Sequence, residues 1–314
     1  MDDFPTISRA ETDERIAAEF EALRPYLMRV AYTHLGSIGE AEDVVQDAWL
    51  RLSGADRADI RELRAWLTKV VSRLALDALT SARARREQYV GPWLPEPVIE
   101  TTGTDADPAS QIDLDESVSM ALLVVLEALS PAERSAFLLH DVFGYSFAEV
   151  AGIVRRTPQA TRQLASRARH AVEARRPRYP AAEDQQREVV RAFRVATENG
   201  DLSALIELLD PAVTFRSDGG GRVNAARKVF SGAERVARIF TAMADHFADQ
   251  LRMRPIVVNG LPGLLMETGG SPTVIAFTLD DGRISEIDLV RNPDKLGTLS
   301  GASSSPEPQR DGGR

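Results

Sequence analysis

In the first quarter of the chain, apolar residues recur every three to four positions, which is the period of an amphipathic helix. One such segment precedes Gly36 and a second follows Gly39, and these glycines interrupt the helical pattern. A third segment covers residues 61–87 and collects basic residues at its far end. We therefore predict three helices in a helical domain over residues 15–87, preceded by a flexible N-terminus over residues 1–14.

Residues 88–117 break this pattern and predict a linker. Four prolines prevent a continuous helix, and the segment holds seven acidic residues and no lysine or arginine. Trp93 and Leu94 stand close to prolines, and two large apolar side chains are costly to leave exposed. We expect this part of the linker to dock on another part of the protein, most simply the C-terminal domain.

The helical period returns over residues 118–177 and predicts a helix-turn-helix. Ser130, Pro131 and Glu133 have the spacing of a capped helix start, and Thr157 with Pro158 marks the start of the last helix. Its buried stripe is predicted to be Ala160, Leu164, Ala168 and Val172. The opposite face presents the donors and arginines that a DNA-reading helix needs: Gln159, Thr161, Arg162, Ser166, Arg167 and Arg169.

Residues 185–297 mix helical and alternating patterns and predict an α+β domain. An amphipathic helix over 185–209 ends in a loop signal, and a second helix follows a glycine-rich turn. Strand-like runs then fill residues 251–290, where Asp281-Gly282 has the sequence of a hairpin turn. We predict helices first and a curved antiparallel sheet after them, followed by a disordered tail over residues 298–314.

Composition narrows the chemistry of this 314-residue chain. It holds no cysteine and four scattered histidines, so we expect no disulfide, no thiolate nucleophile, no metal site and no cofactor. No run of roughly 18 apolar residues predicts a membrane span. The acidic start of the chain is the opposite of a signal peptide. We expect a cytoplasmic protein that does not bind membranes.

The charge is unevenly distributed along the chain. The net charge is −9, which for the whole chain argues against a nucleic-acid binder. However, residues 61–86 hold seven Lys/Arg against two acids, and residues 155–178 hold eight Arg against one Glu. Each basic cluster falls on a predicted helix, so an acidic protein carries two separate basic faces that suit DNA.

The helical part resembles a bacterial RNA polymerase sigma factor of the extracytoplasmic-function group. AEDVVQDAWLRL (residues 41–52) resembles the helix that binds the polymerase clamp, and the helix rich in basic residues after it resembles the reader of the promoter −10 element. The predicted helix-turn-helix resembles the domain that reads the −35 element. The resemblance implies two helical DNA-binding domains, called regions 2 and 4, joined by a linker.

The last part resembles a SnoaL-like domain, a cone-shaped α+β fold that one subgroup of this family, the SigJ type, carries after region 4. Three runs are similar to signatures of that subgroup. They are WLPEP in the linker (Trp93, Leu94, Pro95, Glu96, Pro97), DGGG in the added domain (Asp218, Gly219, Gly220, Gly221) and NPDKL at its end (Asn292, Pro293, Asp294, Lys295, Leu296). We predict that these runs form one regulatory contact region.

The resemblance also assigns residues to the two other surfaces. Asp43, Gln46, Asp47 and Leu50 share a helix face by their spacing and are predicted to bind core polymerase. Four arginines, Arg73, Arg83, Arg85 and Arg86, are predicted to hold −10 DNA.

We therefore expect an alternative sigma factor, not an enzyme, with core RNA polymerase and promoter DNA as partners. Its C-terminal domain would regulate it in cis and could take a small-molecule ligand, and the free protein would be a monomer. Two alternatives stay open. One is a ligand-sensing helix-turn-helix regulator. The other is a SnoaL-like isomerase or cyclase that uses Asp288 or His246.

Overall fold

The computed structural model describes residues 9–56, 60–86, 88–100, 118–175, 177, 179, 181–268 and 272–300. Contacts divide these residues into two units. The first unit contains the described residues up to Arg85, Val118 and those from Leu122 to 175. The second contains those from Arg86 to 100, Ser119–Ala121 and those from Pro177 onward. Among the described residues, no helix is both long and apolar enough to cross a membrane.

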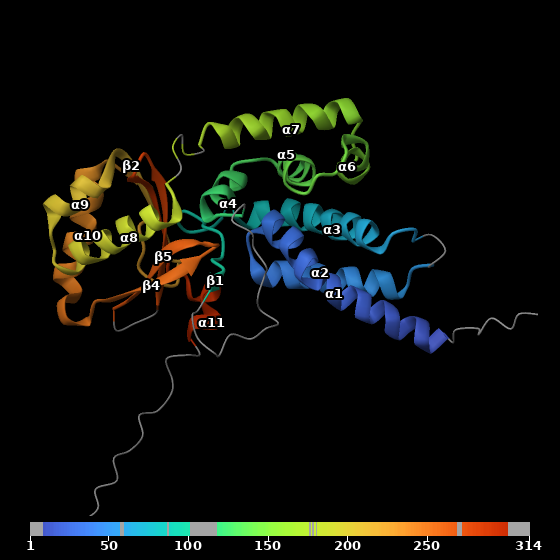
Figure 1. Ribbon diagram of the computed structural model, residues 1–314, viewed down its shortest axis with the longest axis horizontal. Coiled ribbons are helices and arrows are strands. Elements are labelled where there is room, and N and C mark those ends of the chain that lie inside the picture. Colours follow the sequence, from blue (N-terminus) through green and yellow to red (C-terminus); the bar gives the residue numbers. More distant parts are fainter. Residues whose placement is uncertain are drawn as a thin grey trace, which may run out of the picture. The chain divides into compact units, whose positions relative to one another are not determined.

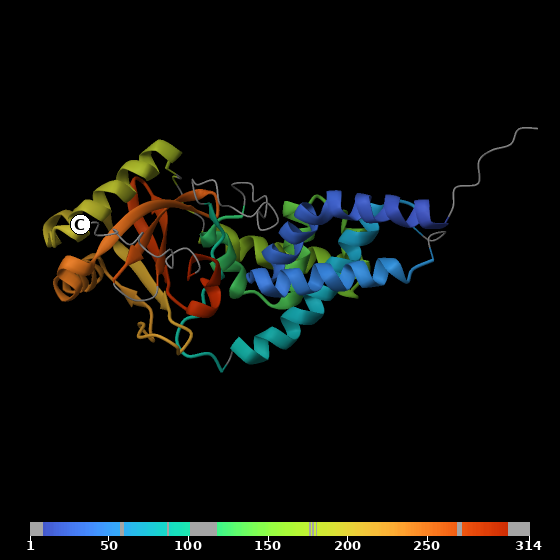
Figure 2. The ribbon, with the colours of Figure 1, turned by 90° about the horizontal axis from the view of Figure 1, so that it is seen from below.

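Three long helices build the first part of unit 1: α1 (Arg9–Leu35), α2 (Ile38–Ser53) and α3 (Leu63–Arg86). Gly36 takes a positive φ of 67° and ends α1, and the hydroxyl of Ser37 caps α2 by accepting from the Glu40 amide. Figure 2 shows α1 and α2 running side by side. The prediction of a flexible N-terminus up to residue 14 is wrong from Arg9 onward, because a polar helix carries no apolar period to reveal it.

Five further helices follow the linker: α4 (Met120–Glu127), α5 (Pro131–Phe137), a π-helical turn η3 (Leu138–Val142), α6 (Phe147–Val154) and α7 (Pro158–Glu173). The predicted capping box between Ser130 and Glu133 is present, and Thr157 caps α7 by accepting from the Ala160 amide at 3.2 Å. Helices α6 and α7 form the predicted helix-turn-helix around a core that includes Leu139, Ile153 and Ala165.

Unit 2 is the predicted α+β domain. Its helices are α8 (Glu183–Glu198), α9 (Leu202–Leu208) and α10 (Ala233–Phe247), followed by the 3-10 turn η4 (Ala248–Gln250). The predicted helix over 185–209 is therefore two helices, because Gly200 turns the chain with a φ of 65°. Figure 1 shows these helices on one face of the sheet, where Phe193, Phe240 and Phe277 meet edge to face.

The sheet has the order β1-β4-β5-β6-β7-β2-β3. Its strands are β1 (Ile99–Glu100), β2 (Leu209–Asp218), β3 (Phe230–Ser231), β4 (Arg252–Val258), β5 (Leu261–Glu267), β6 (Thr273–Asp280) and β7 (Arg283–Val290). Asp281 and Gly282 both have positive φ, as the predicted hairpin turn requires. Among the described strands, five of the six pairs are antiparallel, as predicted, but β2 pairs with β7 in parallel. Strand periodicity does not encode the direction of a neighbour.

Two segments outside this core are ordered: part of the predicted linker, which we expected to dock, and the start of the predicted tail. Residues 88–100, predicted as linker, belong to unit 2 and include its edge strand β1. After β7 come the turn η5 (Pro293–Lys295) and the short helix α11 (Gly297–Ser300), so the predicted disorder is wrong for residues 298–300. The predicted linker residues 101–117 and tail residues 301–314 lie outside the described part of the chain.

Candidate polymerase, nucleic-acid and linker-docking surfaces

The outward face of α2 carries the four residues predicted to bind polymerase. Asp43, Gln46, Asp47 and Leu50 are all exposed, and Leu50 leaves 61 % of its surface accessible. On the opposite face Val45 is fully buried. A large apolar side chain beside two exposed carboxylates is the composition of a protein-binding face that attracts a basic partner.

On α3, the one described arginine predicted to bind −10 DNA already has a partner within unit 1. Arg73 is the one residue of that group whose side chain the structure describes, and it donates from Nη2 to the carbonyl of Gly152 on α6 at 2.8 Å. The side chains of Arg83, Arg85 and Arg86 lie outside the described part. Arg73 is therefore engaged inside unit 1 and has to leave Gly152 before it can hold a phosphate.

The predicted DNA-reading face of α7 is exposed at Gln159, Arg162, Ser166 and Arg167. The prediction that Thr161 belongs to this exposed face is wrong. Its side chain is fully buried and donates to the Thr157 carbonyl at 3.0 Å, which satisfies the hydroxyl without water. The buried stripe runs through Thr161, Ala165 and Ala168, so it is rotated by one residue from the predicted stripe in its first part.

Two arginines of α7 pair with acids of the same unit. The Nε of Arg167 donates to Glu133 at 2.7 Å, and Arg169 donates through Nε and Nη2 to Asp141 at 2.9 and 2.6 Å. Partial burial raises the pKa of Glu133, but hydrogen bonds from Ser130 and Arg167 outweigh it and hold the pKa below its usual value. Arg167 is 61 % exposed, so water or a phosphate reaches its guanidinium.

Within unit 1, the first three helices pack against the helix-turn-helix. The Tyr26 and Tyr145 hydroxyls lie 3.4 Å apart, and Arg134 donates from Nη1 to the carbonyl of His34 at 2.7 Å. Leu76 of α3 packs on the apolar cluster of the helix-turn-helix. The two regions predicted to read separate promoter elements thus contact one another.

In unit 2, the three sequence runs singled out above meet at one buried carboxylate, Asp218 at the end of β2. Asp218 is fully buried and its Oδ2 accepts from the Leu94 amide and from Lys295 Nζ, both at 2.8 Å. Its Oδ1 accepts from the Tyr89 hydroxyl at 2.6 Å and from the Gly220 amide at 3.0 Å. Four donors, two of them from the linker, satisfy the charge, which is what a buried carboxylate requires.

Lys295 completes the attachment of the linker. Its ammonium also donates to the carbonyl of Leu94 and lies 4.0 Å from the centre of the Trp93 ring, a cation–π distance. Leu94, Pro95 and Pro97 are buried, whereas Glu96 is half-buried. Burial, reinforced by Asp218, raises the pKa of Tyr89 far above its usual value, so its hydroxyl stays a donor.

The glycines of DGGG are explained by close approach. Gly220 has a φ of +62°, and a Cβ placed there would lie 2.4 Å from the side chain of Asn292. That side chain donates from Nδ2 to the Tyr89 hydroxyl at 2.9 Å and accepts from the Asp294 amide. Gly219 is equally crowded, since its Cβ would meet the Val223 carbonyl at 2.6 Å, while Gly221 is exposed.

Further along, the linker becomes part of the sheet. The Val98 amide donates to Asn259 Oδ1 at 3.2 Å, and the Asn259 amide donates back to the Val98 carbonyl at 2.8 Å. Ile99 then pairs with Val258 of β4. We call the residues that hold the linker, Asp218, Gly220, Asn259, Asn292 and Lys295, the linker seat.

Sequence reasoning missed two residues of this region, Tyr89 and Asn259. Tyr89 had a weak signal, as a second aromatic residue four positions before Trp93. Asn259 precedes Gly260 at a hairpin turn and takes a positive φ of 49°, so the sequence explains its backbone but not its bond to Val98. The remaining predicted residues line the same region: Leu296 is buried, Pro293 half-buried, and Asp294 exposed beside Arg222.

The residues of the alternative enzyme do not assemble a catalytic pair. Asp288 is 2 % exposed, and its Oδ1 accepts a hydrogen bond from Arg216 Nε at 2.5 Å. Burial raises the pKa of Asp288, although Arg216 opposes that shift. His246 stands exposed at the end of α10 and makes a ring contact with Phe247. Asp288 therefore belongs to an internal ion cluster, in which Arg216 pairs with both Asp288 and Glu286.

Comparison with known proteins supports the interpretation of both helical regions. The family models named Sigma-70 region 2 and Sigma-70 region 4 match residues 20–85 and 119–172. The chain is 42 % identical over 291 residues to the ECF RNA polymerase sigma factor SigJ of Mycobacterium tuberculosis, covering 89 % of this chain and 92 % of that one. It is 37 % identical over 289 residues to the probable ECF sigma factor SigI of the same organism, covering 90 % and 96 %.

The fold agrees with a solved structure over nearly the whole chain. The crystal structure of the M. tuberculosis extracytoplasmic function sigma factor SigJ matches with a TM-score of 0.73 and 37 % identity, covering 90 % of this chain and 98 % of that one. The match includes the helical regions and the α+β domain, as the predicted fold class requires. With these relatives and this architecture, the chain belongs to the family of extracytoplasmic-function RNA polymerase sigma factors.

Proposed function

We propose that this sigma factor is controlled in cis by its C-terminal domain, which holds the region 2–region 4 linker in the linker seat. The family consists of DNA-binding initiation factors and not of enzymes, so the chain is an alternative sigma factor for promoter recognition. The contacts of Asp218 carry the proposal, because they tie linker residues to the added domain through a fully buried charge.

The position of the seat in the sequence supports control of promoter binding. Helix α3, the proposed −10 reader, ends at Arg86, and the docked linker begins at Tyr89. The added domain is therefore attached directly after a DNA-binding helix and acts at a high effective concentration.

The packing inside unit 1 supports the same proposal. Promoter positions −10 and −35 differ by about 25 base pairs, or roughly 85 Å of B-DNA. Arg73 on α3 and Gly152 on α6 are hydrogen-bonded, so the two readers must separate before each reaches its element. We propose that this closed arrangement is the inactive free form and that a restrained linker favours it.

We assign a binding partner to each of three surfaces. Core polymerase binds the α2 face around Leu50, −10 DNA binds the arginines of α3, and −35 DNA binds the exposed residues of α7. Thr161 is not among the DNA contacts, because its hydroxyl is buried.

The protein acts as a monomer in the cytoplasm, where promoter DNA and polymerase are found. A ligand inside the C-terminal domain would contact the apolar core that includes Phe193 and Phe240.

In-vitro transcription with bacterial core polymerase tests the proposal. Wild type is compared with Asp218→Ala, which removes the acceptor of the linker seat, and with Asp294→Ala as a control at an exposed ion pair. We expect a changed transcript yield with Asp218→Ala alone, its sign giving the direction of control. Limited proteolysis between residues 88 and 100 reports linker release. Release of the linker without any change in yield would refute control in cis.

A further inference from the structure

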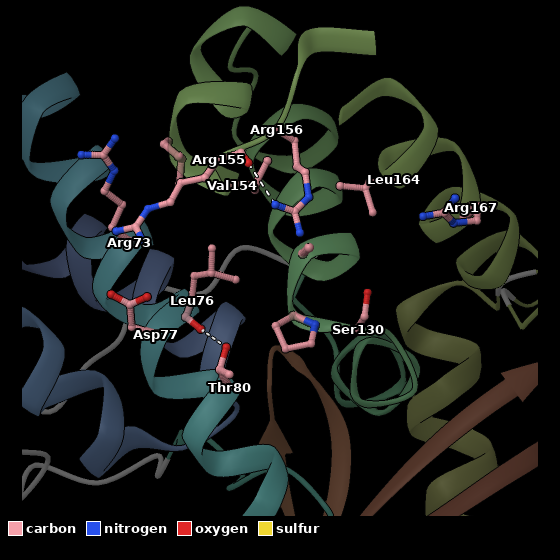
Figure 3. Close-up of a pocket in the computed structure, with 13 residues that line it drawn as sticks. Arg73, Leu76, Asp77, Thr80, Ser130, Val154, Arg155, Arg156, Leu164 and Arg167 are labelled. Carbon is pink, nitrogen blue, oxygen red and sulfur yellow. Dashed lines mark hydrogen bonds between the residues drawn. The ribbon is translucent and has the colours of Figure 1, made fainter. Parts of the chain in front are cut away.

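Unit 1 contains a wide-open cavity of about 680 Å³ between α3 and the helix-turn-helix. Small-molecule sites in proteins typically measure about 300–1,000 Å³. Part of its wall is apolar, formed by Leu76 of α3, Val154 at the end of α6 and Leu164 of α7. Figure 3 shows these side chains around the same opening, with Arg156 pointing into the space between α3 and α7.

The polar part of the lining is strongly cationic. Four arginines and one carboxylate, that of Asp77, line the cavity. Arg167 is neutralised by Glu133, and Arg73 donates to a carbonyl rather than to an acid. Arg155 and Arg156 form no ion pair with any residue that the structure describes. The cavity therefore keeps uncompensated positive charge beside an apolar wall.

The backbone at Arg155 adds an independent observation. Arg155 ends α6 in the left-handed conformation, with φ of 53° and ψ of 52°. Glycine adopts this conformation without strain and is the common residue after a helix end. Arginine at such a position sacrifices some stability, and strain of this kind concentrates at functional sites.

We propose that this cavity binds a nucleoside polyphosphate. The phosphates pair with the guanidinium groups of Arg155 and Arg156, which present planar donors suited to phosphate. The base lies on the apolar wall formed by Leu76, Val154 and Leu164. Duplex DNA exposes phosphates along a continuous backbone and would leave that apolar wall unused, whereas a nucleotide uses both parts of the lining.

The bound nucleotide would contact both α3 and the helix-turn-helix and so hold them together. This consequence rests on the proposed function, in which the two regions separate to reach the promoter. A ligand that binds the closed form alone shifts the population toward it, and promoter binding reciprocally weakens the ligand. The nucleotide would then act as an inhibitor of this sigma factor.

Calorimetric titration of the full-length protein with ATP tests the binding step. We expect one site, with adenosine and inorganic pyrophosphate each binding more weakly than ATP. Arg155→Gly and Arg156→Gln should each weaken ATP about tenfold, the effect of one lost charge-assisted contact. Arg155→Gly also relieves the left-handed strain, so it should fold at least as well as wild type. Exposed Arg175→Gln lies outside the lining and serves as the matched control.

Two outcomes would overturn the proposal. One is the absence of any ATP binding at concentrations up to about 5 mM. The other is equal binding by wild type, Arg155→Gly and Arg156→Gln, which would place the nucleotide elsewhere.

Coupling to the closed form needs a separate readout, because ATP is also a substrate of transcription. The chain has no cysteine, so fluorophores can be attached at cysteines introduced at exposed Lys69 on α3 and Gln163 on α7. ATP should raise the fraction of molecules with the labels close together. An unchanged distance distribution with ATP bound would refute the coupling. Binding of core polymerase without nucleotide tests the proposed function separately.

Discussion

The linker seat and the outer face of α7 each hold a cation against a carboxylate at nearly the same distance, but in different surroundings. Lys295 Nζ lies 2.8 Å from Asp218, with side chains 10 % and 0 % exposed. Arg167 Nε lies 2.7 Å from Glu133, with side chains 61 % and 20 % exposed. Distance alone therefore does not say what a pair does.

Burial decides the role of each pair. Removing one partner of a buried pair strands a charge without water and typically costs about 3–5 kcal/mol, whereas an exposed pair contributes about 0–1 kcal/mol. The Asp218 pair is thus a structural attachment of the linker. Arg167 can exchange Glu133 for a DNA phosphate at little cost, which suits a residue on a DNA-reading helix.

The largest expected effect is at Asp218. Asp218→Ala should lower the free energy of unfolding by about 3–5 kcal/mol, because Lys295 loses its buried counter-charge. Asp294→Ala, at an ion pair 3.3 Å from Arg222 with both side chains at least 60 % exposed, should change it by less than about 1 kcal/mol. Urea denaturation of both variants measures the difference. Equal losses of stability in the two variants would contradict the assigned difference between the buried and the exposed ion pair.

The second prediction concerns the pH dependence of stability that the buried His34 gives to unit 1. Burial lowers the pKa of His34 to about 4, with Arg134 contributing and a hydrogen bond to Val30 opposing. The unfolded chain, with a histidine pKa of about 6.5, then binds more protons than the folded chain as pH falls below that value. The contribution of neutral His34 to the free energy of unfolding is fully present above the unfolded pKa, and it is lost as the pH falls toward 4.

Between pH 7 and pH 5 this linkage should remove about 2 kcal/mol of stability from the wild type. His34→Gln cannot take up the proton, so its stability should lack that component of the pH dependence. Denaturation curves recorded at both pH values for the two proteins provide the measurement. A His34→Gln protein with the full wild-type pH dependence would show that His34 does not cause it.

The third prediction concerns the close packing of the seat. Gly220→Ala combines a positive φ with a Cβ only 2.4 Å from Asn292, so it should destabilise by more than the roughly 1 kcal/mol of left-handed strain. Gly232→Ala is the matched control, because its φ is +100° but no atom lies within 4 Å of the added Cβ. Thermal denaturation compares them. Similar losses would mean that Asn292 yields to the new methyl group.

The smallest effect is expected on the exposed face of α7. Arg167→Ala should weaken promoter binding by the polymerase complex and reduce its salt dependence by about one phosphate contact. Thr161→Val should leave that salt dependence unchanged, because the hydroxyl is buried. Binding measured by fluorescence anisotropy over a range of salt concentrations distinguishes the two. A reduced salt dependence in Thr161→Val would contradict the observed orientation of α7.

The helices and turns that follow local rules were predicted well. The capping box at Ser130, the cap at Thr157 and the Asp281-Gly282 hairpin depend on residues a few positions apart, and each is present. The exposed face of α2 was likewise predictable, because a 3.6-residue period assigns a residue to a side of the helix. Thr161 was misplaced because Ala160 and Thr161 are both small, and only the packing against neighbouring helices selects between them.

Family resemblance and local pattern together predicted the architecture, the three surfaces and the three short runs WLPEP, DGGG and NPDKL. The tertiary structure alone decided how those runs meet. Tyr89, Asp218 and Lys295 are separated by more than 70 residues from one another, and no periodicity links them. The same holds for the parallel pairing of β2 with β7 and for the cavity beside Arg155. Local propensity acts over a few residues, whereas a buried charge is satisfied by whichever donors the folded chain brings to it.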